Sequence, residues 1–146
     1  MRALYAVSVG MALSAVAVSG DAGDKPIVIG EVSSQVARDG IDYASLVRSA
    51  SEDEVRALDM SHVPRGKRVI VSVALVRMDT FAETRTTDAT CEISATLRDA
   101  KRGAVFAILE GRARAKSDGA PNRVELSALQ GALHGALARI PDVLRH

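Results

Sequence analysis

The chain has 146 residues, with 25% charged residues, two Phe, two Tyr and no Trp. Arg2 is the only charged residue before position 21, so the rest of the chain carries 18 basic and 18 acidic residues and no net charge. This balance argues against electrostatic binding of nucleic acid or anionic lipid, and the scarcity of aromatic rings leaves few stacking platforms for bases.

The N-terminal segment Met1–Gly20 predicts a cleavable secretory signal peptide. Arg2 supplies a positive start, and an uncharged, mostly apolar run follows at Ala3–Ser19. A retained membrane anchor is the other interpretation, but the run is barely long enough to span and is rich in Ala and Ser. No Cys lies near the cleavage site, so the usual lipoprotein signal is missing and the predicted location is periplasmic or secreted. Cleavage is expected before Asp21, with rival sites at Ala15-Val16-Ala17 and Ala17-Val18-Ser19.

After a short flexible tail at 21–25 we expect one α/β domain at 26–146. Its first strand, Ile27–Val32, is a β-branched run and is predicted to be buried on both faces. Asp42 is expected to cap the helix that follows, and Ser51 with Glu54 repeats a capping-box pattern. Two interpretations remain open here: two short helices, or one helix broken at Ser49–Ser51. The expected apolar face of the helix comprises Tyr43, Leu46, Val47 and Ala50.

Three strands follow along the chain. Val69–Val76 has apolar residues on both sides, which predicts a central strand. A polar connection at Thr80–Thr87 leads to a strand at Ala89–Arg98, whose strict alternation predicts one buried face. The last strand, Val105–Ala115, is expected to present this apolar face: Val105, Ala107, Leu109, Gly111, Ala113 and Ala115.

The segment between the last two strands predicts a hairpin. Lys101-Arg102-Gly103 fits a three-residue loop whose third residue needs a positive φ, which Gly103 tolerates. Opposite charges across the strands favour a register that avoids placing Glu92 against Glu110. The predicted pairs are Ala100 with Ala104, Glu92 with Arg112, and Cys91 with Ala113.

The C-terminal segment predicts a long amphipathic helix. Asn122 is expected to be its N-cap, with Glu125 reaching back as in a capping box, and Pro141 should end or kink the helix near Ile140. Its apolar stripe comprises Leu126, Leu129, Leu133, Leu137 and Ile140. The whole pattern predicts an α/β (α+β) fold: a single four-stranded mixed sheet with helices packed on one face, in the order β-α-β-β-β-α. The first connection would be a right-handed crossover between parallel strands.

No motif predicts catalytic, cofactor-binding or metal-ligating residues. The three histidines show no ligand spacing to one another or to the single cysteine, and no phosphate-binding or nucleophile-elbow pattern occurs. Cys91 lies on the apolar face of its strand, so we expect a buried packing residue beneath the last helix, with no cation nearby. A Cys91–His134 dyad is the alternative, because that strand and helix are expected to pack together.

Two further features concern interactions. Arg112, Arg114 and Lys116 project from one strand face, which favours a solvated surface over a site for an acidic partner. Gly131 and Gly135, four residues apart, allow close backbone approach in the last helix. Packing of the helix on the sheet is the favoured reason, and a homodimer seam through this helix is the alternative.

The segment Lys67–Leu144 resembles a group of periplasmic α/β domains. The shared features are a long strand at Lys67–Arg77, the segment Cys91–Phe106 with its Asp-x-x-x-Gly turn, and the Ala/Leu-rich final helix. The group includes curli-secretion lipoproteins, outer-membrane activators of penicillin-binding proteins and the N-terminal domain of the Tol propeller protein. Short exported proteins of myxobacteria-type Gram-negatives look similar. This chain lacks the lipobox Cys and the long insertions of the group, so the resemblance implies a fold and an envelope location and transfers no catalytic residue.

These observations favour an exported, non-enzymatic binding or accessory domain that acts by protein contact in the cell envelope. The partner would be an envelope protein or a second copy, with no nucleic acid and no membrane span after signal cleavage, and no cofactor is expected. One alternative is a small hydrolase or thiol enzyme using Cys91 with His134. Another is a carrier for a small apolar ligand held between helix and sheet.

Overall fold

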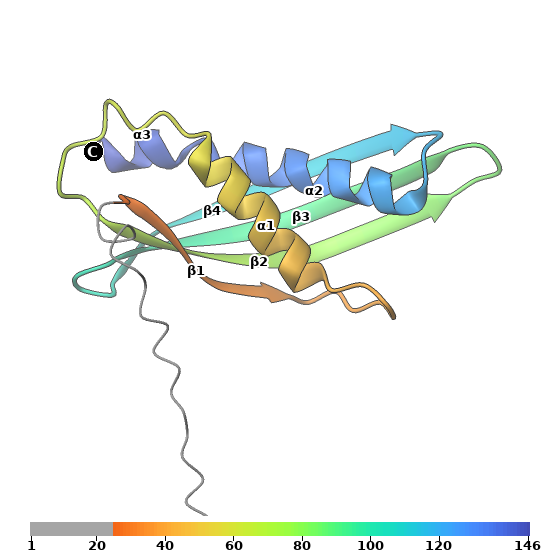
Figure 1. The fold of residues 1–146 in the computed structure, drawn as a ribbon, viewed down its shortest axis with the longest axis horizontal. Coiled ribbons are helices and arrows are strands. Elements are labelled where there is room, and N and C mark those ends of the chain that lie inside the picture. The colour runs from red at the N-terminus through yellow and green to blue at the C-terminus, as the bar shows by residue number, and fades with distance from the viewer. Residues whose placement is uncertain (1–24) are drawn as a thin grey trace, which may run out of the picture.

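A computed structural model describes residues 25–146, so the predicted signal peptide Met1–Gly20 and residues 21–24 of the predicted tail lie outside the described part. The sheet has the strand order β1-β2-β3-β4, with β1 parallel to β2 and the other neighbours antiparallel. This confirms the predicted fold (Figure 1). The elements are β1 Ile27–Ser34, α1 Tyr43–Arg56, β2 Val69–Ala82, β3 Thr87–Asp99, β4 Val105–Ser117, α2 Pro121–Leu137 and α3 Ile140–Leu144.

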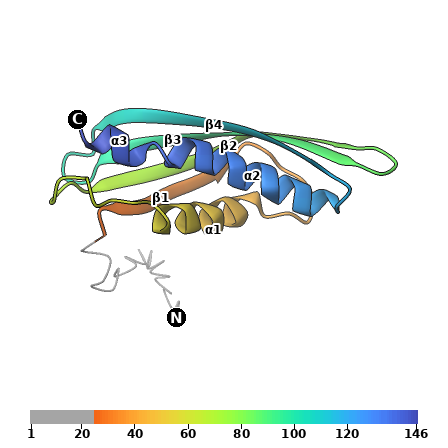
Figure 2. The same ribbon diagram turned by 90° about the horizontal axis from the view of Figure 1, so that it is seen from above.

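The two long helices cover one face of the sheet. Figures 1 and 2 show α1 over β1 and β2, and α2 running beside it along β3 and β4. Along β3 the buried residues alternate with partly exposed ones, as expected for a strand with one covered face. The opposite face carries no further layer within residues 25–146, and we call it the outer face.

The register between β3 and β4 is largely as predicted. Glu92 lies opposite Arg112, Cys91 lies opposite Ala113, and Gly103 has a φ of +69°. The predicted Ala100–Ala104 pair is wrong. Leu97 pairs with Ala107 but Arg98 pairs with Val105, so Phe106 is an extra residue on β4. This irregularity leaves Val105 53% exposed instead of on the buried face.

The strand β2 is longer than predicted. It continues to Ala82 and pairs there with Thr87, so the expected connection Thr80–Thr87 is strand at both of its ends. A bulge at Val76 shifts the alternation, which turns Met78 into the core and Arg77 outward. Simple alternation through the segment would have buried the arginine, which explains why the sequence pattern ended at Val76.

The strand β1 is not buried on both faces, so that prediction is wrong. It is an edge strand, and because no element covers the outer face, Val28 is 39% exposed.

The helix α1 is continuous, begins after the predicted cap Asp42, and shows no break at Ser49–Ser51. Ser51 is fully buried within it and caps nothing, so the capping-box interpretation is wrong. Leu46 is 41% exposed because it lies off the buried stripe.

The N-terminus of α2 also differs from the prediction. The helix begins at Pro121 with Ala120 as N-cap, and no side chain caps it. Proline suits the first helical position because no intrahelical partner exists for an N–H there. Asn122 is therefore not the cap, Glu125 is buried, and Leu126 is 37% exposed. The helix ends before Pro141, as expected, and the short α3 follows.

Close packing of α2 on the sheet depends on a glycine that lies in β4. A Cβ placed on Gly111 would lie 1.9 Å from the carbonyl oxygen of Ala132, whose backbone crosses the strand there. The glycines of α2 matter less: a Cβ on Gly131 would lie 2.9 Å from the Ala113 Cβ, and one on Gly135 would meet nothing within 4 Å. Helix-on-sheet packing therefore explains Gly131 and leaves Gly135 without a packing reason.

We predict that Gly111→Ala destabilises the domain by about 1–3 kcal/mol or more, because the helix backbone must move away from the strand. Gly135→Ala is the matched control. The added methyl group there has room, and alanine is the better helix former by up to about 1 kcal/mol, so stability should rise slightly. Urea denaturation of both variants measures the difference. Equal effects would contradict the close approach at Gly111.

Candidate functional site

The most unusual buried group is the carboxylate of Glu125. It lies in the first turns of α2, among Val124, Ala128 and Leu129, and the residue is only 4% exposed. The helical period places Glu125 on the face of α2 that packs against β2 and the start of α1. The other three residues are each at most 2% exposed. A buried carboxylate is costly unless hydrogen bonds and an opposite charge satisfy it.

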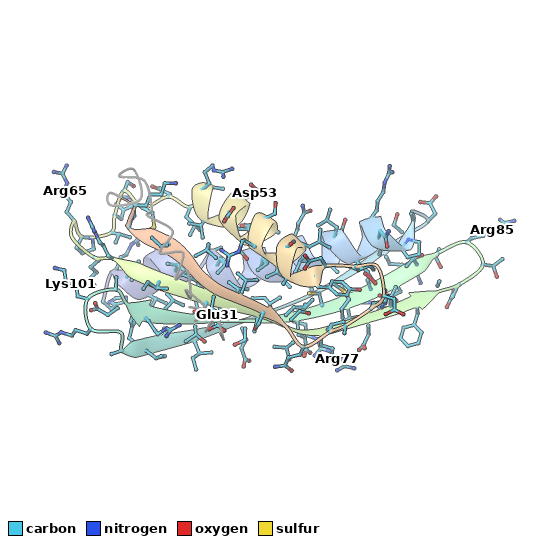
Figure 3. All side chains as sticks on the ribbon, turned by 60° about the horizontal axis from the view of Figure 1, so that its bottom comes forward. Glu31, Asp53, Arg65, Arg77, Arg85 and Lys101 are labelled. Atoms are coloured by element: carbon cyan, nitrogen blue, oxygen red, sulfur yellow. The ribbon has the colours of Figure 1, made fainter. Side chains whose placement is uncertain are left out.

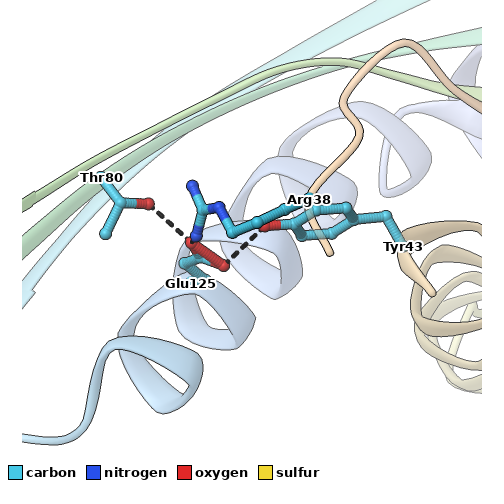
Figure 4. A network of polar contacts seen from close by, with 4 residues as sticks. All are labelled: Arg38, Tyr43, Thr80 and Glu125. Carbon is cyan, nitrogen blue, oxygen red and sulfur yellow. Dashed lines mark hydrogen bonds and ion pairs between the residues drawn. The ribbon is translucent and has the colours of Figure 1, made fainter. Parts of the chain in front are cut away.

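Three side chains from three other parts of the chain satisfy the carboxylate (Figure 4). The Tyr43 hydroxyl, at the start of α1, donates to Oε2 at 3.0 Å, and the Thr80 hydroxyl, on β2, donates to Oε1 at 2.7 Å. The Arg38 guanidinium, in the β1–α1 connection, forms an ion pair with Oε1. We call these four residues the Glu125 junction. It ties the β1–α1 connection, α1 and β2 to α2.

The electrostatics of the junction fit a structural role. Burial raises the pKa of the Tyr43 hydroxyl, and the hydrogen bond to Glu125 raises it further, so the tyrosine remains a donor. Both carboxylate oxygens already accept hydrogen bonds, from Tyr43 on one side and from Thr80 and Arg38 on the other. To act as a general base, Glu125 would have to give up a donor that holds the fold together.

An apolar cleft opens beside the junction, between the N-terminal ends of α1 and α2. Its volume is about 500 Å³, within the range of ligand pockets. Its walls are mostly apolar and come from Ile41, Tyr43, Leu46, Met78, Leu126 and Leu129. Its polar lining includes Asp42, Asn122 and Arg123 besides the occupied Glu125 carboxylate. The cleft therefore offers a place for an apolar group.

The structure does not bring Cys91 and His134 together. Cys91 is fully buried in the core, and burial raises the pKa of its thiol to about 12, so the thiol is protonated and inert at neutral pH. The His134 side chain is 71% exposed, and its Nδ1 lies 3.2 Å from Glu54 Oε2 on α1. The predicted burial of Cys91 is confirmed, and the dyad required by the thiol-enzyme alternative is absent.

The predicted basic face on β4 is largely neutralised by its neighbours. Arg112 lies 3.2 Å from the Glu92 carboxylate, and Arg114 forms a forked contact with Asp88 on β3. Cross-strand pairs of this kind are typical of a solvated sheet face, which was the favoured interpretation. In the part of the chain that the structure covers, no three His, Cys, Asp or Glu side chains lie close enough to hold a metal ion.

The most exposed apolar side chains of the outer face lie at two separate places. Phe81, next to the β2–β3 turn, is 71% exposed and borders a hollow with Asp88 and Arg114. Phe106 and Ile108, next to the β3–β4 turn, are 47% and 62% exposed. These are the two phenylalanines of the chain, and they mark opposite ends of the sheet.

Sequence reasoning missed the Glu125 junction. Its members are 45 to 87 positions away from Glu125, so no local pattern connects them. Glu125 also fitted a capping box, a local explanation that hid the better one. The available signal was the helical period, because Glu125 falls beside the apolar stripe, where a solvated carboxylate is not expected.

Comparison of the sequence with family models and with curated proteins found no match. Solved structures share the fold. One is PelC of Paraburkholderia phytofirmans, a dodecamer, with 16% identity over 79% of this chain and 88% of that one, at a TM-score of 0.54. Another is a hypothetical protein of Chlamydia trachomatis, with 7% identity over 81% of this chain and 96% of that one, at a TM-score of 0.56. Identities this low indicate the fold alone.

We predict that Glu125→Ala destabilises the domain by about 3 kcal/mol, because three donors lose their acceptor in a buried place. The matched control is Glu54→Ala, which removes a helix glutamate whose histidine partner is mostly exposed, and should change stability by less than about 1 kcal/mol. Chemical denaturation of both variants provides the comparison. Similar small losses would show that the junction is dispensable.

Cys91 should be a packing residue. Cys91→Ala is expected to cost on the order of 1 kcal/mol through lost contacts and a small cavity. The thiol pKa is raised from 9.0 to about 12 in the folded chain, so its contribution is present below pH 9.0 and is lost as pH rises toward 12. Stability of the wild type should therefore fall more steeply over that range than stability of the variant. Rapid labelling of the folded protein by a thiol reagent would contradict this role.

Proposed function

We propose that the protein is an exported, non-enzymatic domain of the cell envelope that acts by protein contact. The periplasmic or secreted location is supported by the predicted signal peptide and by the resemblance to periplasmic α/β domains. Across residues 25–146, no helix is long and apolar enough to cross a membrane. The absence of a free reactive group at the junction, and the buried, protonated thiol, favour contact over catalysis.

One observation carries the proposal: an exposed aromatic side chain and an open apolar cleft lie at the same end of the sheet, on opposite faces. Phe81 lies opposite Asp88 on the outer face, three residues after Met78, which lines the cleft on the helix side. A side chain with 71% of its surface exposed gains from burial, and the cleft has walls of matching polarity. We infer that Phe81 of one copy inserts into the cleft of another.

Phe81 and the cleft lie on opposite faces of the sheet, which favours a head-to-tail contact over a reciprocal exchange between two copies. Head-to-tail contacts close into rings or extend into filaments. PelC, whose fold this chain shares, is a dodecamer, so high-order assembly is compatible with this architecture. The alternative homodimer seam through α2 has weaker support, because the exposed residues near Gly135 include Gln130, His134 and Ala138, and none of them is a large apolar residue.

We predict that Phe81→Ser abolishes self-association, measured by sedimentation velocity of the exported protein. Phe106→Ser is the matched control, because it removes the other phenylalanine from the far end of the same face and leaves the proposed contact intact. Both residues are well exposed, so both variants should keep the wild-type denaturation midpoint. The wild type should sediment as an oligomer larger than a dimer, and so should Phe106→Ser.

A monomeric wild type, or equal loss of association in both variants, would contradict the proposal.

A carrier for a small apolar ligand is the second candidate function, favoured by the volume and apolar lining of the same cleft. It predicts a monomer that binds a fluorescent apolar probe, with binding weakened by Leu126→Ser, a cleft residue that is 37% exposed, and unchanged by Phe81→Ser. Self-assembly instead predicts that bound probe is displaced as the protein concentration rises.

A further inference from the structure

The end of the sheet opposite Phe81 collects exposed basic side chains. Four of them, which we call the basic end, come from two segments far apart in the sequence: Arg65, Arg68, Lys101 and Arg102. Figure 3 shows Arg65 and Lys101 at one end of the molecule and Arg85 at the other. The segment Met60–Arg68 contains no acidic residue, and the β3–β4 turn contains only Asp99.

Backbone hydrogen bonds hold these segments together. The Ala100 N–H donates to the Arg68 carbonyl at 3.1 Å, which fixes the β3–β4 turn against the start of β2. The Val69 N–H donates to the Pro26 carbonyl at 2.8 Å, so the described chain, which begins at Lys25, also starts here. The basic end is therefore a built feature of the sheet end and does not depend on the conformation of one loop.

Unlike most arginines elsewhere in the domain, the basic side chains lack internal partners. Arg38, Arg77, Arg112 and Arg114 each form an ion pair with a carboxylate, whereas none of the four residues of the basic end forms one with any described residue. The nearest acid, Asp99, uses Oδ1 to accept the Lys101 and Arg102 backbone N–H groups at 2.7 and 3.3 Å. The Asp99 carboxylate therefore stabilises the turn and forms no ion pair with the basic side chains.

Exposed apolar side chains lie next to these charges. Val105, Phe106 and Ile108 follow the turn on β4 and are 53%, 47% and 62% exposed. This combination suits a membrane surface, which has anionic headgroups above acyl chains. The basic groups would contact the headgroups, and the aromatic and aliphatic groups would face the acyl chains. A soluble polyanion would use the charges and leave the apolar groups in water.

We propose that the basic end docks on an anionic lipid surface, with Phe106 and Ile108 entering the headgroup layer. The zero net charge of residues 21–146 argues against attraction of the domain as a whole, whereas this docking uses the charges of one end. Attraction to a surface acts within about a Debye length of 8–10 Å, so it depends on the charges facing the lipid.

The test is co-sedimentation of the exported protein with vesicles of phosphatidylethanolamine and phosphatidylglycerol, and with neutral vesicles of phosphatidylethanolamine and phosphatidylcholine. Arg102→Glu should weaken binding to the anionic vesicles on the order of tenfold, because it removes one attractive charge near the lipid and adds a repulsive one. Arg85→Glu makes the same charge change in the turn at the far end and should bind like the wild type. Phe106→Ser should weaken binding while keeping its dependence on salt.

Three results would overturn the inference: equal binding to anionic and neutral vesicles, equal losses in Arg102→Glu and Arg85→Glu, or binding that salt does not reduce. Tight binding of single-stranded nucleic acid that Arg102→Glu weakens, with no vesicle binding, would identify a polyanion site instead. The inference is independent of self-assembly, because Phe81→Ser should leave vesicle binding of the single copy unchanged. Circular dichroism of each variant confirms that the fold is retained.

Discussion

The buried carboxylate of Glu125 is the constraint on which the arrangement of this domain depends. The sheet and α2 pack through apolar contacts, whereas the apolar residues of the β1–α1 connection, Val36 and Ile41, are only partly buried against the core. Glu125 fixes them through Arg38 and Tyr43, while Thr80 fixes the distal part of β2. Because an unpaired buried carboxylate is so costly, all of these segments must be in place together. The cleft between the two helix N-termini is a consequence of this arrangement.

The two ends of the sheet present different chemistry. At one end the cleft and Phe81 offer a receiving and an inserting surface, and at the other end unpaired basic groups lie beside Phe106 and Ile108. The ion pairs of Arg112 and Arg114 neutralise the outer face between them. Side chains also occupy carbonyl groups on both edge strands. Arg48 donates to the Gly30 carbonyl on β1, and Arg139 donates to the Glu110 carbonyl on β4. Contact through end surfaces is therefore favoured over strand addition along the edges.

Local pattern was sufficient to predict the fold, the register at Glu92 and the burial of Cys91, because alternation and helical period report directly on which face is covered. It failed where one residue was inserted, at Val76 and Phe106, because a bulge reverses the alternation without a sequence signature. It also failed at Glu125, where a plausible local cap concealed contacts with distant residues. The junction forms only in the tertiary structure, and local sequence patterns do not predict which distant residues contact Glu125.

The most direct test of assembly by head-to-tail contact is a disulfide crosslink formed in the envelope. Phe81→Cys and Leu126→Cys place one thiol on the inserting surface and one at the mouth of the cleft, while native Cys91 is buried and does not interfere. The double variant should form a ladder of multimers on a non-reducing gel, because each copy links to two neighbours. Either single variant should remain monomeric. A ladder that is absent, or dimers formed by each single variant, would contradict the account.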